Sequence, residues 1–343
     1  MTTKILFTGD CRINGKYQKG IQNLFALFPD YDLYVVNFES SIQIDSSIPL
    51  TPKSVPISAS LEDVEFLLSY VDPKKLLLNF SNNHSLDAGQ KNLTEAKQWL
   101  QNKGVHIIDS GEKIKIELKK SSFSFSAFNQ TGWETASKNI CKTEDACNIA
   151  LLHWGEEYIF SPHPKQRSVA KELALCGVDF VIGAHPHVLQ GWECIDHCSV
   201  FYSLGNTVFG IPKMPIESKL GSVLSIQFTK ETTTKILPLV MNDDSSIKTS
   251  THQSEFKKLE YLLNNNLIKK HWVWNAEASI PFFKNHLTSW RKRFSKNGRQ
   301  ELIPFLRACC SRTYLNMFFG LILSKTSKKK RHDILSIIKE CIK

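Results

Sequence analysis

The chain of 343 residues lacks the features typical of a membrane or secreted protein. Its longest strongly apolar run, residues 317–323, is far shorter than the roughly 20 residues that cross a bilayer. Its nine cysteines form no regular framework, which favours a reducing compartment over a disulfide scaffold. Because the first residues lead directly into an apolar run at residues 5–8, we expect no signal peptide or membrane anchor before the fold. These absences predict a soluble, cytoplasmic protein.

The sequence also lacks a glycine-rich phosphate loop of the P-loop or Rossmann type, so it implies no nucleotide cofactor. Cys194 and Cys198, with an aspartate and a histidine between them, lie between two strand-like runs. We interpret this segment as a hairpin turn rather than a zinc site. With 42% hydrophobic residues the chain can bury a full core, which excludes disorder as its main state.

The net charge of +10 is unevenly distributed. Residues 241–343 carry 20 Lys and Arg against 8 Asp and Glu, whereas residues 1–240 carry 23 against 25. Aromatic residues alternate with the cations of this basic segment, at residues 271–274, 290–294 and 318–331. Such a segment can contact a membrane surface, an anionic polymer or another protein, but at helical spacing it more often packs onto its own domain. We expect a helical cap, leave peripheral membrane contact open, and do not expect nucleic acid as a partner.

Residues 1–240 alternate between strand-like and helical patterns, which predicts an α/β layered fold. Apolar residues at helical spacing predict helices at residues 61–70, 90–102 and 165–176. Short β-branched and aromatic runs predict strands at residues 4–8, 33–37, 76–80, 105–108, 122–128, 149–153 and 180–182. Later runs are typical of antiparallel strands that close the sheet, at residues 189–194, 200–203, 222–229 and 234–240. The polar stretch 241–250 predicts a boundary between a domain at residues 1–240 and a helical extension at residues 241–343.

Five of the predicted strands end in side chains that can bind a metal or transfer a proton. In a parallel sheet such ends meet in one crevice. The candidate metal ligands are two carboxylates, one amide and three imidazoles, namely Asp10, Glu39, Asn83, His153, His185 and His187. This mixed set suits manganese, iron or zinc rather than calcium, so we expect one or two divalent transition metals. A metal at this position would lower the pKa of a bound water for hydrolysis.

Other polar residues near these strand ends have two interpretations each. His84 lies next to a candidate ligand and could protonate a leaving group, since an imidazole suits that task near pH 7. Asp87 either orients His84 or caps a helix. Arg12 either clamps an anionic substrate in bidentate fashion or covers the sheet edge facing solvent. Asn206 either lines the crevice or turns the chain.

The motifs together resemble the CapA family of capsule-biosynthesis proteins, a branch of the calcineurin-like metallophosphoesterases that is also associated with poly-gamma-glutamate synthesis. The resemblance covers about residues 3–240. It is carried by Gly9-Asp10, Asn37-Phe38-Glu39-Ser40, Asn82-Asn83-His84-Ser85-Leu86-Asp87, His153-Trp154-Gly155-Glu156-Glu157-Tyr158, His185-Pro186-His187-Val188 and Tyr202-Ser203-Leu204-Gly205-Asn206.

The resemblance implies a four-layer sandwich, in which two mixed β-sheets are flanked by helices and the site lies at the strand ends. It also implies that Asp10 and His187 hold one metal and that Glu39 bridges to a second. The remaining ligands, Asn83, His153 and His185, would complete the second position. The wider superfamily has histidine where this chain has Arg12, and aspartate where it has Glu39.

The implied activity is that of a metal-dependent hydrolase, which activates a metal-bound water against a phosphoester or related bond. The substrate would be an anionic small molecule or polymer, and the role would be linked to capsule or surface-polymer biosynthesis, with capsule-synthesis proteins as partners. Two alternatives stay open at this point. The chain could be a non-catalytic assembly factor with a vestigial metal site, or an interaction module that uses its basic segment.

Overall fold

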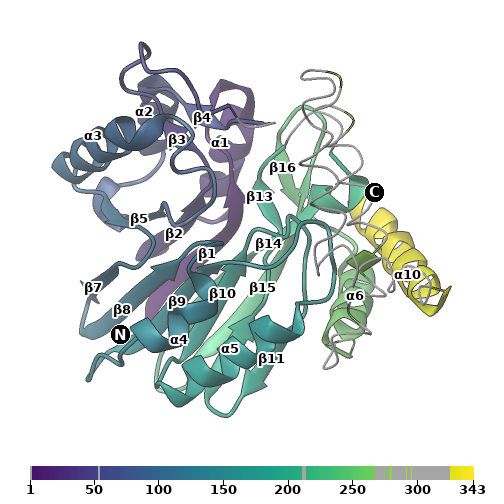
Figure 1. The fold of residues 1–343 in the computed structure, drawn as a ribbon. Coiled ribbons are helices and arrows are strands. Elements are labelled where there is room, and N and C mark those ends of the chain that lie inside the picture. Colours follow the sequence, from purple (N-terminus) through teal and green to yellow (C-terminus); the bar gives the residue numbers. More distant parts are fainter. Residues whose placement is uncertain are drawn as a thin grey trace.

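A computed structural model describes residues 2–52, 55–210, 214–265 and 325–343, together with the isolated residues Leu267, Trp274, Ala278, Ser279, Arg291 and Ser295. Two β-sheets lie face to face, and helices cover their outer sides (Figure 1). The predicted α/β sandwich of two mixed sheets flanked by helices is therefore confirmed.

The first sheet contains the N-terminal strands, and its order is β16-β15-β14-β1-β2-β5-β6, with β13 also pairing with β1. Strands β1, β2, β5 and β6 are parallel, whereas β14, β15 and β16 run antiparallel. The bounds are β1 Thr3–Cys11, β2 Leu33–Phe38, β5 Leu76–Asn79, β6 His106–Ile108, β13 Asn206–Val208, β14 Leu220–Phe228, β15 Thr233–Met241 and β16 Ile247–Thr249.

The second sheet has the order β11-β12-β10-β9-β8-β7. Its strands β8, β9, β10 and β12 are parallel, and only its two edge strands are antiparallel to their neighbours. The bounds are β7 Lys113–Leu118, β8 Ser121–Phe128, β9 Cys147–His153, β10 Phe180–Ala184, β11 Trp192–Ile195 and β12 Cys198–Phe201. A short separate pair consists of β3 Ser41–Ile42 and β4 Ser58–Ala59.

One expectation about the strands is wrong: the five site-bearing strand ends come from two facing sheets rather than one, because hydrophobic periodicity shows that a strand is buried but not which strand lies beside it. A second is only partly right, since the run at residues 200–203 pairs antiparallel with β11, as expected, but parallel with β10. The three predicted helices and the first seven predicted strands are present with bounds shifted by at most a few residues.

Helices pack on the outer face of each sheet (Figure 1). Those on the first sheet are α1 Gln18–Leu27, α2 Leu61–Leu68 and α3 Gly89–Asn102, and those on the second are α4 Ala136–Asn139 and α5 Pro164–Leu175. Helix α2 begins with a capping box, in which the Ser60 side chain accepts from Asp63 N and the Asp63 side chain accepts from Ser60 N. Helix α5 begins with Pro164 at its first turn, where the missing N–H costs nothing.

Strand alternation decides which side chains face the space between the sheets. On β2, Leu33 and Val35 belong to the core between the sheets, whereas Tyr34 and Val36 pack under the helices. With a period of two, Asn37 and then Glu39 continue the inner row. The same period on β9 places His153 in the row of Ile149 and Leu151.

On strand β1, Asp10 also faces the space between the sheets, but only because the strand is irregular. Ile5 and Phe7 face the core between the sheets, so regular alternation would turn Asp10 toward the helices. The register with β2 shifts between Phe7 and Asp10, which adds one residue to β1 and turns Asp10 inward. Gly9 lies in this irregular segment, and a Cβ there would lie only 2.0 Å from the Gly205 carbonyl oxygen. Glycine is therefore required immediately before the inward-facing carboxylate.

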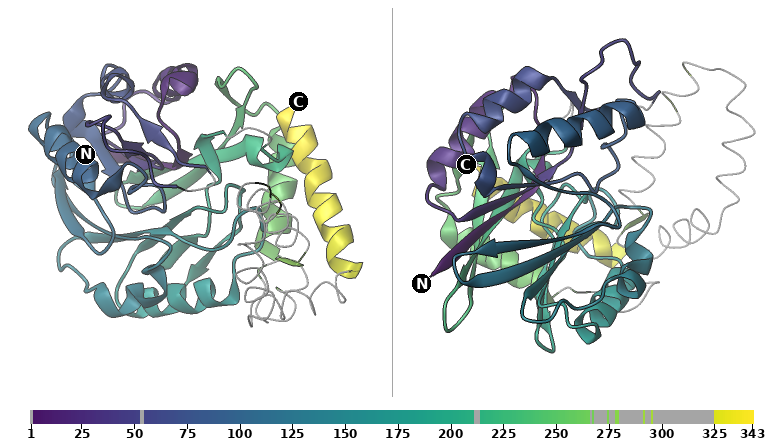
Figure 2. Two further views of the ribbon diagram at one scale, coloured as in Figure 1. Left: turned by 45° about the horizontal axis from the view of Figure 1, so that its top comes forward. Right: turned by 90° about the vertical axis from the view of Figure 1, so that its left-hand side faces the viewer.

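The C-terminal part of the chain packs against the sandwich. Helices α6 Gln253–Asn265 and α10 Lys325–Ile342 contact one another and lie together at one side of the molecule (Figures 1 and 2). The first sheet continues past residue 240 to Thr249, so the domain boundary expected there falls inside β15 and remains a prediction. No described helix combines the length and the apolar character needed to cross a bilayer.

Most of the aromatic and basic stretches of this extension lie outside the described residues. Trp274 is described, is 2% exposed, and donates from its indole nitrogen to Ser161 O at 3.0 Å. It therefore packs onto the main domain, as expected for a helical cap. Lys330 and Arg331 also contact the main domain rather than projecting freely into solvent.

Candidate metal centre

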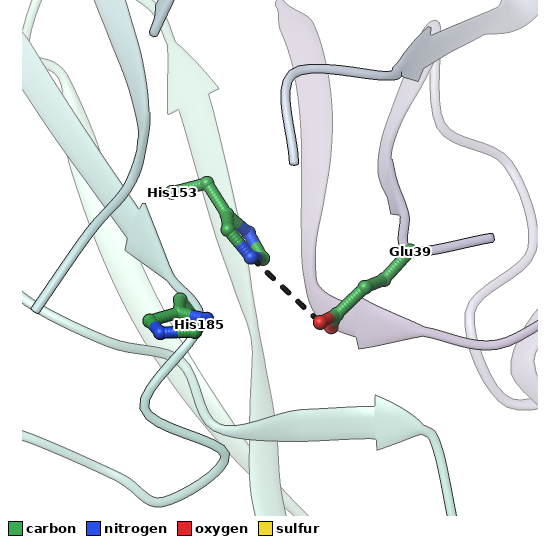
Figure 3. Close-up of side chains that lie close together, drawn as sticks. All are labelled: Glu39, His153 and His185. Carbon is green, nitrogen blue, oxygen red and sulfur yellow. Dashed lines mark ion pairs between the residues drawn. The ribbon is translucent and has the colours of Figure 1, made fainter. Parts of the chain in front are cut away.

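The predicted ligands from the two sheets converge on one place. Asp10 and Glu39 come from the ends of β1 and β2, and His153, His185 and His187 from the ends of β9 and β10. Figure 3 shows Glu39 extending toward the imidazole of His153, with His185 beside it. All five residues are at most 4% exposed. The sequence therefore predicted correctly which residues meet.

These side chains form two overlapping groups that could each hold a metal ion. One group is Glu39, His153 and His185, and the other is Asp10, Glu39 and His187. Within each group the candidate ligand atoms all lie within 4.8 Å of one another. Glu39 belongs to both groups, which is the bridging place that the family resemblance implied. The assignment of these residues as ligands remains a prediction.

Glu39 provides the best test of whether a metal fits. Its side chain is fully buried, and neither carboxylate oxygen has a hydrogen-bond partner among the described residues. The nearest nitrogens, Nε2 of His153 and Nε2 of His187, each lie 3.7 Å from Oε1. Burial, and then the charge of Asp10, raise the pKa of Glu39 well above its usual value. Because a buried carboxylate without hydrogen bonds is costly, a cation between these groups would compensate it, and the residues fit a metal.

Asp10, in contrast, is fully paired. Its carboxylate accepts from Asn37 Nδ2 at 2.8 Å and from His185 N at 3.2 Å, and lies 3.1 Å from His187 Nδ1. Burial raises the pKa of Asp10, but the hydrogen bond and charge of His187 outweigh burial and lower it to about 2. Burial lowers the pKa of His187, but the charge of Glu39 and the hydrogen bond with Asp10 raise it to about 10. To bind at Asp10, Glu39 and His187, a metal ion would have to displace the proton with which His187 pairs with Asp10.

His153 and His185 are neutral ligand candidates. Burial, followed by the nearby His185, holds the pKa of His153 well below its usual value, and burial lowers that of His185 to about 4. His153 Nε2 lies 2.7 Å from the side-chain oxygen of Asn83, so the predicted amide ligand is also in place. Neutral imidazole is the form that binds a metal, and no proton has to be displaced from a charged ring here.

The backbone near two of the histidines is strained. His185 has φ of 97° and His187 has φ of 56°, in the left-handed region that side chains other than glycine rarely adopt. His185 Nδ1 is also buried without a hydrogen-bond partner in the described part of the chain. Strain and an unpaired buried nitrogen persist only where surrounding contacts enforce them, which is typical of a functional site.

Three further side chains contact the candidate ligands, and the sequence assigned none of them that role. Asn37 donates to Asp10 and its Nδ2 lies 3.5 Å from His153 Nδ1, so it lies between the two ligand groups. Asn206 Oδ1 lies 2.9 Å from His187 Nδ1, and Gln130 Nε2 lies 2.7 Å from His185 Nε2. Such contacts fix the orientation and tautomer of a ligating imidazole. The available signal for Asn37 was an amide inside an otherwise apolar buried strand.

Glu157 is a further carboxylate that the sequence did not assign as a ligand. It is exposed, and its ligand atoms lie within 4.8 Å of those of His185 and His187. The Glu157 carboxylate therefore lies near one histidine of each candidate ligand group, on the solvent-exposed side. Its position after Gly155, in the motif that follows β9, was the only sequence signal.

The predicted acid lies next to these ligands. His84 Nδ1 lies 2.6 Å from Asp87 Oδ2, which also accepts from Ile57 N at 2.8 Å. Helix α3 has no side-chain cap, so of the two interpretations of Asp87 the structure shows the contact with His84. The His84 side chain is 12% exposed and that of Asp87 is fully buried, which leaves the imidazole accessible while its partner is fixed.

Arg12 matches neither of its two interpretations directly. Its guanidinium donates from Nη1 to Gly210 O at 2.9 Å and lies 5.6 Å from the centre of the Tyr17 ring. It is partly buried, so it does not simply cover a sheet edge. It belongs to none of the candidate metal groups among the described residues, and a role in binding an anionic substrate remains a prediction.

Comparisons with known proteins agree with the motifs. Residues 127–211, which include all three candidate ligand histidines, match the family model described as bacterial capsule synthesis protein PGA_cap. The chain is 27% identical over 241 residues to the PGA biosynthesis protein CapA of Bacillus subtilis, and 26% identical over 205 residues to the capsule biosynthesis protein CapA of Bacillus anthracis. The resemblance to the CapA family is confirmed.

The CapA matches are partial on both sides. They cover 59% and 50% of this chain, and 62% and 49% of the two relatives. Similar solved structures include a novel phosphatase of Mycoplasma pneumoniae, 14% identical, which covers 70% of this chain and 94% of its own with a TM-score of 0.47. Another is a hypothetical protein from Thermus thermophilus, which is 12% identical. The match covers 69% of this chain and 99% of that protein, with a TM-score of 0.46. At these scores neither structure carries an argument about function.

The departure at Arg12 leads to a prediction about metal content. The group containing Asp10 must break an ion pair to bind a metal and has Arg12 where the resemblance implied a histidine, whereas the group of His153 and His185 is neutral and has Asn83 beside it. We expect each chain to retain nearer one metal ion than two. We expect Arg12→His to raise the occupancy of the second metal position. Elemental analysis of both proteins, purified without chelator, measures this. A wild-type chain with two tightly held metals would contradict it.

Proposed function

We propose that this chain is a metal-dependent hydrolase that acts on a phosphoester or related bond. The observation that supports this most strongly is Glu39, a fully buried carboxylate without a hydrogen-bond partner among the described residues, which belongs to both candidate metal groups. A structural carboxylate would normally be paired, whereas a bridging ligand needs both oxygens available. The CapA similarity supports the same assignment.

Each group of residues then has a defined task. Asp10, Glu39 and His187 hold one metal position, and Glu39, Asn83, His153 and His185 hold the other. A divalent metal bound there lowers the pKa of a water molecule and neutralises negative charge on the attacked group. Asn37 orients ligands of both positions at once, through Asp10 and His153.

The proton for the leaving group comes from His84 in this proposal. Asp87 accepts from Nδ1 of His84, so the ring presents Nε2 to the leaving oxygen. Because Asp87 is buried and also fixed by Ile57 N, the imidazole is held in one orientation before substrate binds. This arrangement favours substrates whose leaving group needs protonation.

The biological substrate that we propose is an anionic small molecule or polymer of capsule or surface-polymer biosynthesis. The support is the names of the two Bacillus relatives, which describe PGA and capsule biosynthesis. Capsule-synthesis proteins as partners and a cytoplasmic location likewise belong to this proposal, as does peripheral membrane contact through the basic extension.

A metal-dependence assay tests the activity. Protein stripped with a chelator will hydrolyse p-nitrophenyl phosphate or bis-p-nitrophenyl phosphate only after Mn²⁺, Fe²⁺ or Zn²⁺ is restored. Glu39→Gln, which keeps the size of the side chain and removes its charge, will not recover. Wild-type protein that retains no metal and cleaves no phosphoester would instead support a non-catalytic assembly factor with a vestigial site.

A further inference from the structure

One loop covers the candidate ligands from the solvent side. It follows β9 and contains Gly155, Glu157 and Tyr158. The backbone nitrogen of Tyr158 donates to Pro186 O at 2.8 Å, between the two ligand histidines of the second strand end. The Tyr158 ring centre lies 6.0 Å from that of His187. Gly155 has φ of 89°, which glycine adopts readily, but Tyr158 has φ of 63°, so other contacts must hold the loop in this form.

The C-terminal extension supplies those contacts. Arg331, on α10, donates from Nη1 to Tyr158 O at 3.1 Å, and its guanidinium lies 5.1 Å from the centre of the Phe160 ring. Lys330 Nζ donates to Ser161 Oγ at 3.1 Å, and Trp274 donates to Ser161 O. The basic cluster that opens α10 therefore turns at least two of its cations toward the loop.

A second path leads from Arg331 to the same ligand. Its Nη2 forms an ion pair with Glu217, whose side chain is 9% exposed. The next residue, Ser218, accepts through its carbonyl oxygen from Asn206 Nδ2 at 3.0 Å. Asn206 Oδ1 in turn lies 2.9 Å from His187 Nδ1. The guanidinium thus connects to His187 through Tyr158 on one side and through Glu217 and Asn206 on the other.

We propose that Arg331 is a positioning residue for the metal centre, through which the C-terminal extension holds His187 and the loop that carries Glu157. The inference rests on the proposed function, since it assumes that His187 is a ligand. Arginine suits this role because its planar fork reaches two acceptors at once, whereas lysine offers a single charged point. Outer contacts of this kind change metal affinity by about 10-fold to 100-fold when removed.

The test compares Arg331→Ala with Lys329→Ala in the full-length protein. Lys329 is an exposed neighbour on the same helix, so the control removes the same charge without the contacts. Titration calorimetry with Mn²⁺ should show affinity weakened by about 10-fold to 100-fold for Arg331→Ala and changed less than about twofold for Lys329→Ala. Arg331→Lys, which keeps the charge and one contact, should lie between them.

Hydrogen exchange of the metal-free proteins gives a readout that does not depend on metal binding or activity. The Tyr158 amide should exchange faster in Arg331→Ala, while the amides of the core strand β8 exchange as in the wild type. Faster exchange throughout the protein would mean general destabilisation and would overturn a local role. Arg331→Lys provides the same comparison if the alanine variant does not fold.

The outcomes separate the two proposals. Unchanged Mn²⁺ affinity together with unchanged Tyr158 exchange in Arg331→Ala overturns the inference. If the wild type binds no metal at all, the proposed function fails, and exchange alone decides whether Arg331 holds the loop: a local increase supports the contact and no increase overturns it.

Discussion

Replacing His185 by alanine will lower metal affinity by about 100-fold or more, because even residues that only support a ligand contribute about 10-fold to 100-fold. His185 is 2% exposed, and its Nδ1 atom has no hydrogen-bond partner within the described structure. The variant therefore removes a candidate ligand atom that makes no structural hydrogen bond with the described residues, together with the contact between Gln130 and His185 Nε2. Elemental analysis and Mn²⁺ or Zn²⁺ titration of both proteins measure the effect.

The matched control is His197→Ala, which removes an exposed imidazole from the turn between β11 and β12. It should leave metal content unchanged. Equal and negligible metal in the wild type and in His185→Ala would refute the metal assignment. Equal and substantial metal in both would show that the ion binds elsewhere.

Replacing His84 by alanine will preserve metal and fold but lower turnover by about 100-fold to 10,000-fold, the range expected of one positioned proton donor. The loss will be smaller for substrates with good leaving groups, because these need no proton. Asp87→Asn should also lower turnover, since the amide no longer stabilises the charged ring and can hold it in the wrong tautomer. Steady-state kinetics with an aryl and an alkyl phosphoester measure the difference.

The Asn83→Ala variant distinguishes the role of the proposed acid, His84, from that of the neighbouring candidate metal ligand, Asn83. Asn83 contacts His153, so its loss should lower metal content and turnover together. His84→Ala with full activity on an alkyl ester and intact metal would remove His84 from the mechanism. Loss of metal in His84→Ala would make it a ligand or a structural residue instead.

The sequence indicated the α/β sandwich and which polar side chains come together, whereas the roles of those side chains remain predictions. Each ligand ends an apolar run, and strand alternation places Glu39 and His153 in line with core residues that are readily recognised. Asp10 was recognised from its motif, although its inward direction depends on a register shift that periodicity does not reveal. Whether two parallel strands belong to one sheet or to two facing sheets depends on contacts between distant segments, so the two-sheet origin of the site was not accessible from local patterns.

Residues that support the ligands were harder to predict for the same reason. Asn37 acts through its neighbours in space, and its own position in the sequence indicates only a buried strand. Arg331 lies 173 residues from Tyr158, within a basic cluster that the sequence predicted only as part of a helical cap. Burial and pairing of one cation among many depend on the fold, and composition alone cannot distinguish it from its neighbours.

The candidate ligands come from both sheets, with Asp10 and Glu39 on one sheet and the three imidazoles on the other. A bound ion would therefore act as a cross-link between the halves of the sandwich as well as a reagent. By mass action, an ion that binds only the folded chain adds about 2.7 kcal/mol of stability when its free concentration is about 100 times its Kd. The concentration of metal in the cell would then govern the stability of the folded protein as well as its rate of catalysis.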